Sequence, residues 1–287
     1  MHYYKNKKCL ITGAASGIGH ATALALAKAG AQLALTDINE AALKNTANQV
    51  QALGGTLLGI FPLDISHYDS VKQMADTLHL THGSMDVLMN IAGISTWGTI
   101  DKLQHHHWRE LVEVNLMGPI HILELFTPAM MAAGKGGHVV NVSSAAGLFG
   151  LPWHAAYSAT KFGLRGISEV LRFDLRAHKI HVSLVCPGAV DTGLVQTIKI
   201  VGIHQQHPKV QALVQRFQRH AVTPEKAALR MLKGVRKKRY WVYTSWDIAF
   251  GHWFTRKWAW PYEWLMRGLS RLIQRTALAV AKEEHKN

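Results

Sequence analysis

The sequence contains little cysteine: only Cys9 and Cys186 occur in 287 residues. Each lies in an apolar run that is typical of a buried strand, so we expect both thiols to be buried small hydrophobic groups. Two cysteines so far apart support neither a disulfide scaffold nor a zinc site with paired cysteine ligands. The histidines show no ligand spacing either, and we therefore expect no metal site.

Long apolar runs are also missing. No stretch of about 18 uncharged apolar residues occurs, which argues against a membrane-spanning helix. The residues before the first apolar strand, MHYYKNK, hold no apolar region of the kind that a secretory signal needs. From these two absences we expect a cytoplasmic protein.

Acidic residues are scarce relative to basic ones, 18 against 32, which gives a net charge of +14. Residues 226–287 hold 14 basic and 4 acidic side chains, so +10 of the excess lies in this last part. Such an asymmetry indicates an anionic partner for the segment, or simply a solvated basic face. The apolar fraction of 48% is that of a globular chain with a real core.

Short apolar runs alternate with segments of helical periodicity. The runs are nearly continuously apolar, as expected for parallel strands that are buried on both faces. They cover residues 8–12, 32–37, 55–64, 86–93, 137–144 and 180–188, with a seventh at 239–245. This alternation predicts an α/β fold with a Rossmann-like, doubly wound, mainly parallel seven-stranded sheet and helices on both faces. We expect one domain over residues 1–245 and a C-terminal helical extension over 246–287.

A glycine-rich turn, TGAASGIG (12–19), joins the first strand to a helix. Glycines at 13, 17 and 19 allow a sharp turn and a close approach of the backbone to a ligand. The amide groups at the start of the following helix favour a bound phosphate. Together, strand, turn and helix predict a dinucleotide site.

Asp37 ends the second predicted strand, 18 residues past Gly19. This is close to the spacing of a carboxylate that binds an adenosine ribose. The carboxylate would repel a 2′-phosphate, and neither Ala15 nor Ile38 offers a positive charge to offset that repulsion. We therefore predict NAD rather than NADP. The alternative for Asp37 is a helix N-cap.

Further motifs follow in order along the chain. They are Asp64-Ile65, Asn90-Ile91-Ala92-Gly93, Asn115, Ser144, Tyr157 with Lys161 four residues later, and Pro187-Gly188 followed by Val190 and Thr192. With these motifs and the glycine-rich turn, the sequence resembles the short-chain dehydrogenase/reductase family over about residues 5 to 245. It departs from the family pattern at Ile91, where the family has a second asparagine, and this puts the local hydrogen bonding in doubt.

The resemblance implies an NAD site and an oligomer. The residues that would bind the cofactor are Gly13, Ser16, Gly17, Ile18, Gly19, Asp37, Asp64, Ile65, Asn90, Ala92, Gly93, Tyr157, Lys161, Pro187, Gly188, Val190 and Thr192. The family also implies a homodimer or homotetramer, formed through the helices that bear Asn115 and Tyr157.

The catalytic residues implied are Asn115, Ser144, Tyr157 and Lys161. On a helix, Tyr157 and Lys161 lie on one face. Because a nearby ammonium group stabilises a phenolate, we expect the pKa of Tyr157 to lie below the usual value of about 10, so that it can act as base in oxidation or acid in reduction. Ser144, rather than its neighbour Ser143, would donate a hydrogen bond to the substrate oxygen. By resemblance, Lys161 also binds the ribose, and Asn115 holds a water that links Lys161 to solvent.

The predicted substrate is a bulky apolar secondary alcohol or its ketone. Apolar residues follow the candidate serine, namely Phe149, Leu151 and Trp153, and the loop near 95–97 and a long segment at 193–226 should complete the pocket. The alternative function is a non-catalytic NAD(H)-binding or scaffold protein. The intact set of Ser144, Tyr157 and Lys161 argues against it.

The C-terminal extension is rich in tryptophan: six of the nine tryptophans lie at or after position 241. Residues 262–280 show one apolar helical stripe with arginines off it. Such basic helices suit a membrane interface, so we predict peripheral membrane contact. The helix could instead cover the substrate cleft or pack on another subunit. We expect no nucleic acid partner.

Overall fold

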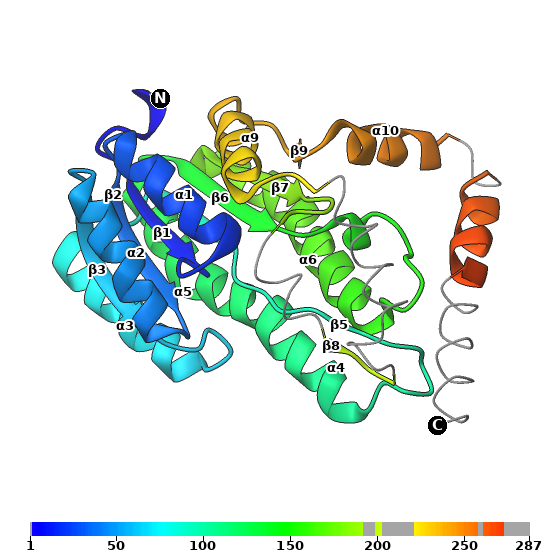
Figure 1. Cartoon of the computed structure of the whole chain (residues 1–287). Helices are drawn as coiled ribbons and strands as arrows, with labels where there is room; N and C mark the ends of the chain where they lie inside the picture. The colour runs from blue at the N-terminus through cyan, green and yellow to red at the C-terminus, as the bar shows by residue number, and fades with distance from the viewer. Residues whose placement is uncertain (1, 192–198, 203–220, 258–260, 273–287) are drawn as a thin grey trace.

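The computed structural model describes residues 2–191, 199–202, 221–257 and 261–272 (Figure 1). Its centre is a seven-stranded parallel sheet in the order β3-β2-β1-β4-β6-β7-β9. The strands are β1 (Lys8–Thr12), β2 (Gln32–Asp37), β3 (Thr56–Pro62), β4 (Val87–Asn90), β6 (Gly137–Val142), β7 (Ile180–Cys186) and β9 (Trp241–Tyr243). The predicted doubly wound sheet is confirmed, with its seventh strand at the edge.

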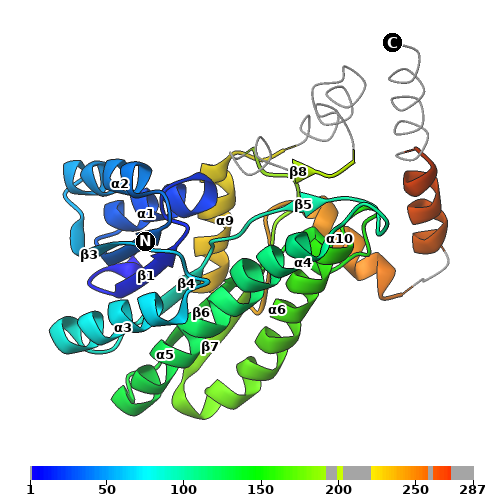
Figure 2. The same ribbon diagram turned by 90° about the horizontal axis from the view of Figure 1, so that it is seen from below.

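Helices cover both faces of the sheet, as Figure 2 shows. One layer holds α1 (Gly17–Lys28), α2 (Glu40–Ala52) and α9 (Pro224–Arg236). The other holds α3 (Tyr68–His82), α5 (Gly118–Ala133) and α6 (Ala155–Asp174). Because both faces are covered, almost every residue of β1, β4, β6 and β7 is buried, and this explains their unbroken apolar runs.

The two cysteines are free and buried, as predicted. Cys9 lies on β1 among side chains from the α1 layer, whereas its neighbour Leu10 packs into the α3 layer. Burial raises the pKa of both thiols, to about 12 for Cys186. Both cysteines therefore act as small core residues.

A long helical segment runs from His105 to Ala133 through α4 (His105–Val112), a π-helical turn η2 (Glu113–Met117) and α5. By length and composition it could cross a membrane. However, Ile122 and Phe126 lie fully buried in the core between α3 and the sheet. We therefore assign it to the core of the domain.

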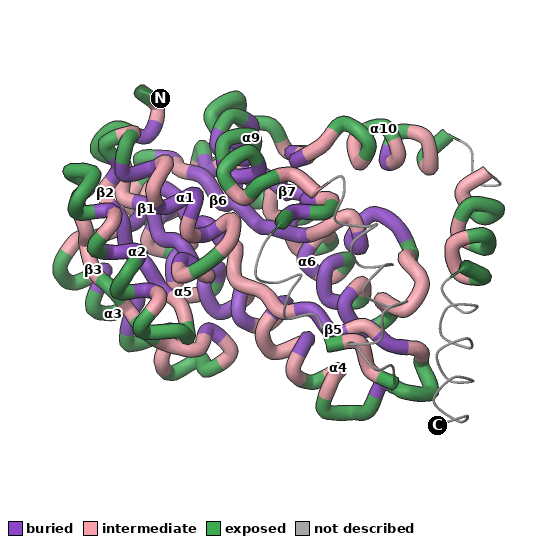
Figure 3. The backbone as a smooth tube through the Cα atoms, in the orientation of Figure 1, coloured by how far each residue is buried: buried purple, intermediate pink, exposed green. Residues whose placement is uncertain are grey.

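The chain after β9 forms α10 (Trp246–Thr255) and a second helix over residues 261–272, at the end of the molecule away from β3 (Figure 1). In Figure 3, exposed and intermediate positions alternate along α10, and its buried residue is His252. The predicted helical extension is thus confirmed for the described residues. Part of the predicted stripe, Ile273, Ala277 and Val280, lies outside them, as does most of the segment 193–226.

Two leucines on α3 test how far this core stabilises the fold. Leu78 is fully buried, whereas Leu80 is 88% exposed. We expect Leu78→Ala to lower the free energy of unfolding by about 2–5 kcal/mol, because it removes apolar contacts and leaves a cavity. The matched variant Leu80→Ala should change it by less than about 0.5 kcal/mol. Urea unfolding followed by circular dichroism measures both, and equal losses would contradict the assigned orientation of α3.

Candidate active site

The glycine-rich turn lies at the carboxyl end of β1, between β2 and β4, where the strand order reverses. In open α/β sheets such a switch point is where ligands bind. A Cβ atom at Gly13, whose φ is +70°, would lie 2.8 Å from the backbone of Ala92. One at Gly19 would lie 1.9 Å from the carbonyl oxygen of Gly13. The close packing of this turn therefore depends on glycine at both positions.

The segment 90–93 supports the turn through its backbone. The Thr12 hydroxyl accepts hydrogen bonds from the amides of Ile91 and Ala92, at 3.0 and 3.1 Å. The side chain of Asn90 is buried and donates to Asn141 on the neighbouring strand. The departure at Ile91 therefore leaves the backbone bonds at this position intact, and its apolar side chain packs against the core.

Asp37 is the half-buried carboxylate beside the turn. Its Oδ2 atom accepts a hydrogen bond from the Ala15 amide, and its Oδ1 atom one from the Asn39 amide, both at 3.0 Å. The cap of α2 is instead Asn39, which accepts from the amide of Ala42. The alternative role of Asp37 as the helix cap is therefore wrong, and its carboxylate is tied to the glycine-rich turn.

The other predicted cofactor residues surround the same edge of the sheet. Asp64 accepts from the Ser66 amide, and Ile65 is buried against Gly118. Pro187 accepts a hydrogen bond from the Ala145 amide at 2.7 Å, which joins the strand end after β7 to the serine loop. Thr192 lies outside the described residues.

The two serines after β6 point in different directions. Ser143 is buried and donates to the carbonyl oxygen of Lys161 at 2.9 Å. Ser144 is less buried, and its hydroxyl forms a hydrogen bond with the Tyr157 phenol. The structure therefore brings Ser144, and not Ser143, to the tyrosine.

Tyr157 and Lys161 lie one turn apart on α6, and both are buried. The Lys161 ammonium is 5.7 Å from the centre of the Tyr157 ring and donates to the Val142 carbonyl at 3.2 Å. Burial lowers the pKa of Lys161 to about 8. Burial also raises the pKa of Tyr157, and the Ser144 hydrogen bond offsets this only in part. The expected lowering of the tyrosine pKa by Lys161 is therefore absent in the protein alone, because desolvation of the phenol is the larger effect.

Asn115 lies fully buried in the π-helical turn. Its side-chain amide donates to the Ile94 carbonyl and to the Thr160 hydroxyl, and its oxygen accepts from the Ile94 amide. These bonds hold the loop after β4 against α6. A Cβ atom at Gly93 would lie 3.0 Å from the Asn115 side chain and 3.3 Å from the Lys161 nitrogen, so Gly93 makes room for both.

Apolar side chains surround Tyr157 on its remaining side. The cluster contains Leu103, Leu111, Ala146 and Ala156, with Ile94, Trp108, Leu151 and Val201 at its border. Val201 follows β8 (Lys199–Ile200), which pairs with β5 (Thr96–Trp97) in a small parallel sheet. This second sheet brings part of the segment 193–226 to the loop near Trp97. The pocket that the sequence predicts from these two segments stays a prediction.

His154 was missed by the sequence reasoning. Its ring lies 4.3 Å from the Trp97 ring and 6.2 Å from the Tyr157 ring, measured between centroids. Burial lowers its pKa, so it is neutral at pH 7. Its position three residues before Tyr157, on the same face at the start of α6, was the available signal.

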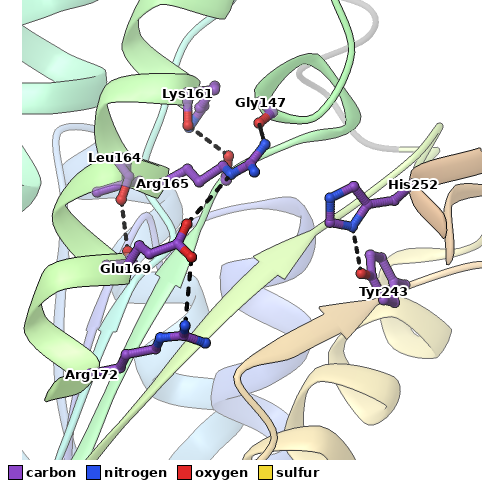
Figure 4. Close-up of polar contacts among 10 residues, drawn as sticks. Gly147, Lys161, Leu164, Arg165, Glu169, Arg172, Tyr243 and His252 are labelled. Carbon is purple, nitrogen blue, oxygen red and sulfur yellow. Dashed lines mark hydrogen bonds and ion pairs between the residues drawn. The ribbon is translucent and has the colours of Figure 1, made fainter. Parts of the chain in front are cut away.

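Figure 4 shows two sets of polar contacts, one along α6 that reaches the serine loop and a separate one between Tyr243 and His252 of α10. Arg165 lies one turn after Lys161, donates to the Gly147 carbonyl and pairs with Glu169. The guanidinium of Arg165 also lies 5.2 Å from the Trp241 ring centre. His252 from α10 also packs edge-on against Trp241 and forms a hydrogen bond with the Tyr243 hydroxyl. Contacts therefore run without a break from the serine loop to α10.

Comparison with known proteins identifies the family. Residues 7–200 match the short chain dehydrogenase family, and the chain therefore belongs to this family of oxidoreductases. It is 33% identical over 239 residues to a Mycobacterium tuberculosis protein named "Putative oxidoreductase SadH", covering 83% of this chain and 85% of that protein.

A second relative is longer than this chain. "Probable oxidoreductase EphD" of Mycobacterium tuberculosis is 33% identical over 247 residues, which cover 83% of this chain but 40% of EphD. The chain thus matches less than half of that protein. Among solved structures, a short-chain dehydrogenase/reductase from Burkholderia phymatum in complex with NAD has a TM-score of 0.79 at 28% identity, covering 88% of this chain and 93% of that one.

Within the described part of the chain, no group of three or more His, Cys, Asp or Glu side chains is arranged to hold a metal ion.

The buried lysine predicts a pH dependence of stability. An unfolded lysine has a pKa near 10.4, whereas burial lowers that of Lys161 to about 8. Between these values the unfolded chain binds more protons, so stability rises with pH. Relative to Lys161→Met, the wild-type protein should gain about 2 kcal/mol of unfolding free energy between pH 8 and 10. Urea unfolding at each pH measures this gain.

The control is Lys44→Met, which removes an exposed lysine from α2. Its unfolding free energy should follow that of the wild-type protein across the same pH range. Parallel pH profiles for the wild-type protein and Lys161→Met would contradict the burial of the charge.

Proposed function

We propose that this chain is an NAD-dependent dehydrogenase that transfers a hydride between the nicotinamide and a hydrophobic secondary alcohol or its ketone. The observation that carries the proposal is the arrangement of the buried Tyr157 and Lys161, one helical turn apart on α6 with the ammonium 5.7 Å from the centre of the ring. Ser144 accompanies them and lowers the pKa of the phenol. The Burkholderia phymatum relative with bound NAD supports the cofactor. A non-catalytic scaffold would have no need for this buried polar set.

The cofactor site fits a dinucleotide. Gly13 and Gly19 leave room where any Cβ atom would meet backbone, and the first turn of α1 offers its free amides to a pyrophosphate. Asp37, held beside the turn, would bind the adenosine ribose and disfavour a 2′-phosphate. When bound, the nicotinamide would exchange the hydride and, in its oxidised form, add positive charge beside the phenol.

The acid and base role falls to Tyr157. Because its pKa is raised in the protein alone, the phenol is protonated at rest and can donate a proton to a carbonyl in the reductive direction. In the oxidative direction, Lys161 would stabilise the phenolate, which then takes the proton that the alcohol hydroxyl loses and becomes a neutral phenol. Ser144 would hold the substrate oxygen, and Asn115 and Gly93 would position Lys161.

The apolar cluster around Tyr157 supports a hydrophobic substrate. Trp97 and the neutral His154 add flat surfaces beside the phenol.

We also propose a homodimer or homotetramer, because Val170 and Phe173 on α6 are 58% and 59% exposed. A panel of secondary alcohols and ketones, including long-chain compounds and sterols, followed by NADH absorbance would identify the substrate class.

Substitution of the tyrosine tests the reaction. We expect Tyr157→Phe to lower turnover by at least about a thousandfold, because the proton donor is lost, while NADH still binds. Stopped-flow or steady-state absorbance measures turnover, and quenching of tryptophan fluorescence measures NADH binding. Near-normal activity in Tyr157→Phe would overturn the assignment.

The serine pair supplies a matched control. Ser144→Ala should lower kcat by about 100-fold or more, the usual cost of losing a donor to the reacting oxygen. Ser143→Ala removes the hydrogen bond that Ser143 donates to the Lys161 carbonyl. It should lower the free energy of unfolding and leave the hydrogen bond from Ser144 to the substrate intact. An equal loss of kcat in both variants would argue against the assigned role of Ser144.

Substitution of Asp37 tests the cofactor preference. In Asp37→Ser the repulsion of a 2′-phosphate is removed, so the ratio of kcat/KM for NADPH to that for NADH should rise by at least about tenfold. Asn39→Ala, which removes only the cap of α2, serves as the control and should leave the ratio unchanged. An unchanged ratio in Asp37→Ser would contradict the proposed contact.

A further inference from the structure

The helix α10 is held on the domain by one of its faces. Ile248 lies against Gly188, where a Cβ atom would come within 2.9 Å of it, and Gly251 lies against Phe149 in the serine loop. His252 is 4% exposed and bonds Tyr243 on β9. These positions, 248, 251 and 252, share one side of the helix. The orientation of α10 on the domain is therefore set by its own side chains.

The opposite face of α10 is aromatic and open to solvent. Trp246 is 78% exposed and Phe250 52%, and their ring centres are 6.2 Å apart. Trp253, on the same side, is 51% exposed. Large aromatic side chains gathered on an exposed face mark an interaction site more often than an ordinary surface.

The second helix, residues 261–272, repeats this arrangement. The Tyr262 hydroxyl accepts a hydrogen bond from the Gly150 amide at 2.7 Å and anchors the helix on the serine loop. On the same helix, Trp264 and Leu265 are 76% and 57% exposed. Both helices lie at the same end of the molecule (Figure 1), so we treat their exposed residues Trp246, Phe250, Trp264 and Leu265 as one aromatic surface.

Basic residues accompany the aromatic surface. Arg256, Lys257, Arg267 and Arg271 are exposed on the two helices. The acidic residues beside them in the described part are Asp247 and Glu263, and Glu263 pairs with Arg267 at 2.6 Å. Exposed tryptophans next to arginine and lysine are typical of helices that lie in the interface of a bilayer.

We propose that the aromatic surface docks the protein on an anionic lipid bilayer. A bilayer takes up the aromatic rings at its headgroup level, while its negative charge attracts the surrounding basic side chains. A second copy of the chain would fit less well, because joining two such surfaces would bring like charges together. The proposal does not depend on the reaction at Tyr157, and it would place the serine loop, to which both helices are anchored, beside the lipid.

Vesicle flotation of the full chain tests the proposal. We expect the protein to float with phosphatidylcholine vesicles that contain phosphatidylglycerol, and to bind vesicles of phosphatidylcholine alone at least about tenfold more weakly. Trp246→Ala/Phe250→Ala/Trp264→Ala should weaken binding to the anionic vesicles by at least about tenfold. The matched control Leu80→Ala/Leu229→Ala removes exposed apolar side chains from α3 and α9 and should bind like the wild-type protein.

A charge variant keeps the test independent of packing at the aromatic residues. Arg256→Glu/Lys257→Glu should weaken binding to anionic vesicles by roughly tenfold or more, and the loss should shrink at high salt. Failure of the wild-type protein to float with anionic vesicles would overturn the proposal. So would unchanged binding in the aromatic variant together with dissociation of an oligomer in sedimentation velocity, which would show that the surface joins two copies.

Discussion

The burial of the Lys161 ammonium is the constraint on which the rest of the site depends. A charged group that is 4% exposed needs polar partners and close packing, and here it has the Val142 carbonyl and the space left by Gly93. The lowered pKa, about 8, corresponds to a cost of about 3 kcal/mol for the charged form. The large core on both sides of the sheet offsets this cost, so the fold can keep a lysine where solvent does not reach.

Burial also sets the resting state of the tyrosine. The pKa of Lys161 is lowered and that of Tyr157 is raised, because burial disfavours the charged form of each side chain. Ser144 opposes the rise through its hydrogen bond. The protein therefore fixes the position of the phenol. A lower pKa of Tyr157 would need positive charge from a molecule that binds beside it.

The loop after the serine connects the site to the C-terminal extension. Phe149 and Gly150 contact α10 and the helix at 261–272, while Arg165 bridges Gly147 to Trp241. A shift in the position of the extension would therefore change the position of Ser144, because packed side chains connect the two. This arrangement places the extension against the loop that follows Ser144, although the two are far apart in sequence.

The sequence by itself determined the strand order in the chain, the glycine-rich turn and the pairing of Tyr157 with Lys161, because apolar periodicity and helical spacing are local properties. Only the tertiary structure decided that Asp37 is tied to the turn and leaves the cap to Asn39, and that burial raises the pKa of Tyr157. These outcomes depend on which distant backbone groups and side chains surround each residue, and desolvation in particular is a property of the packed interior that no local pattern encodes.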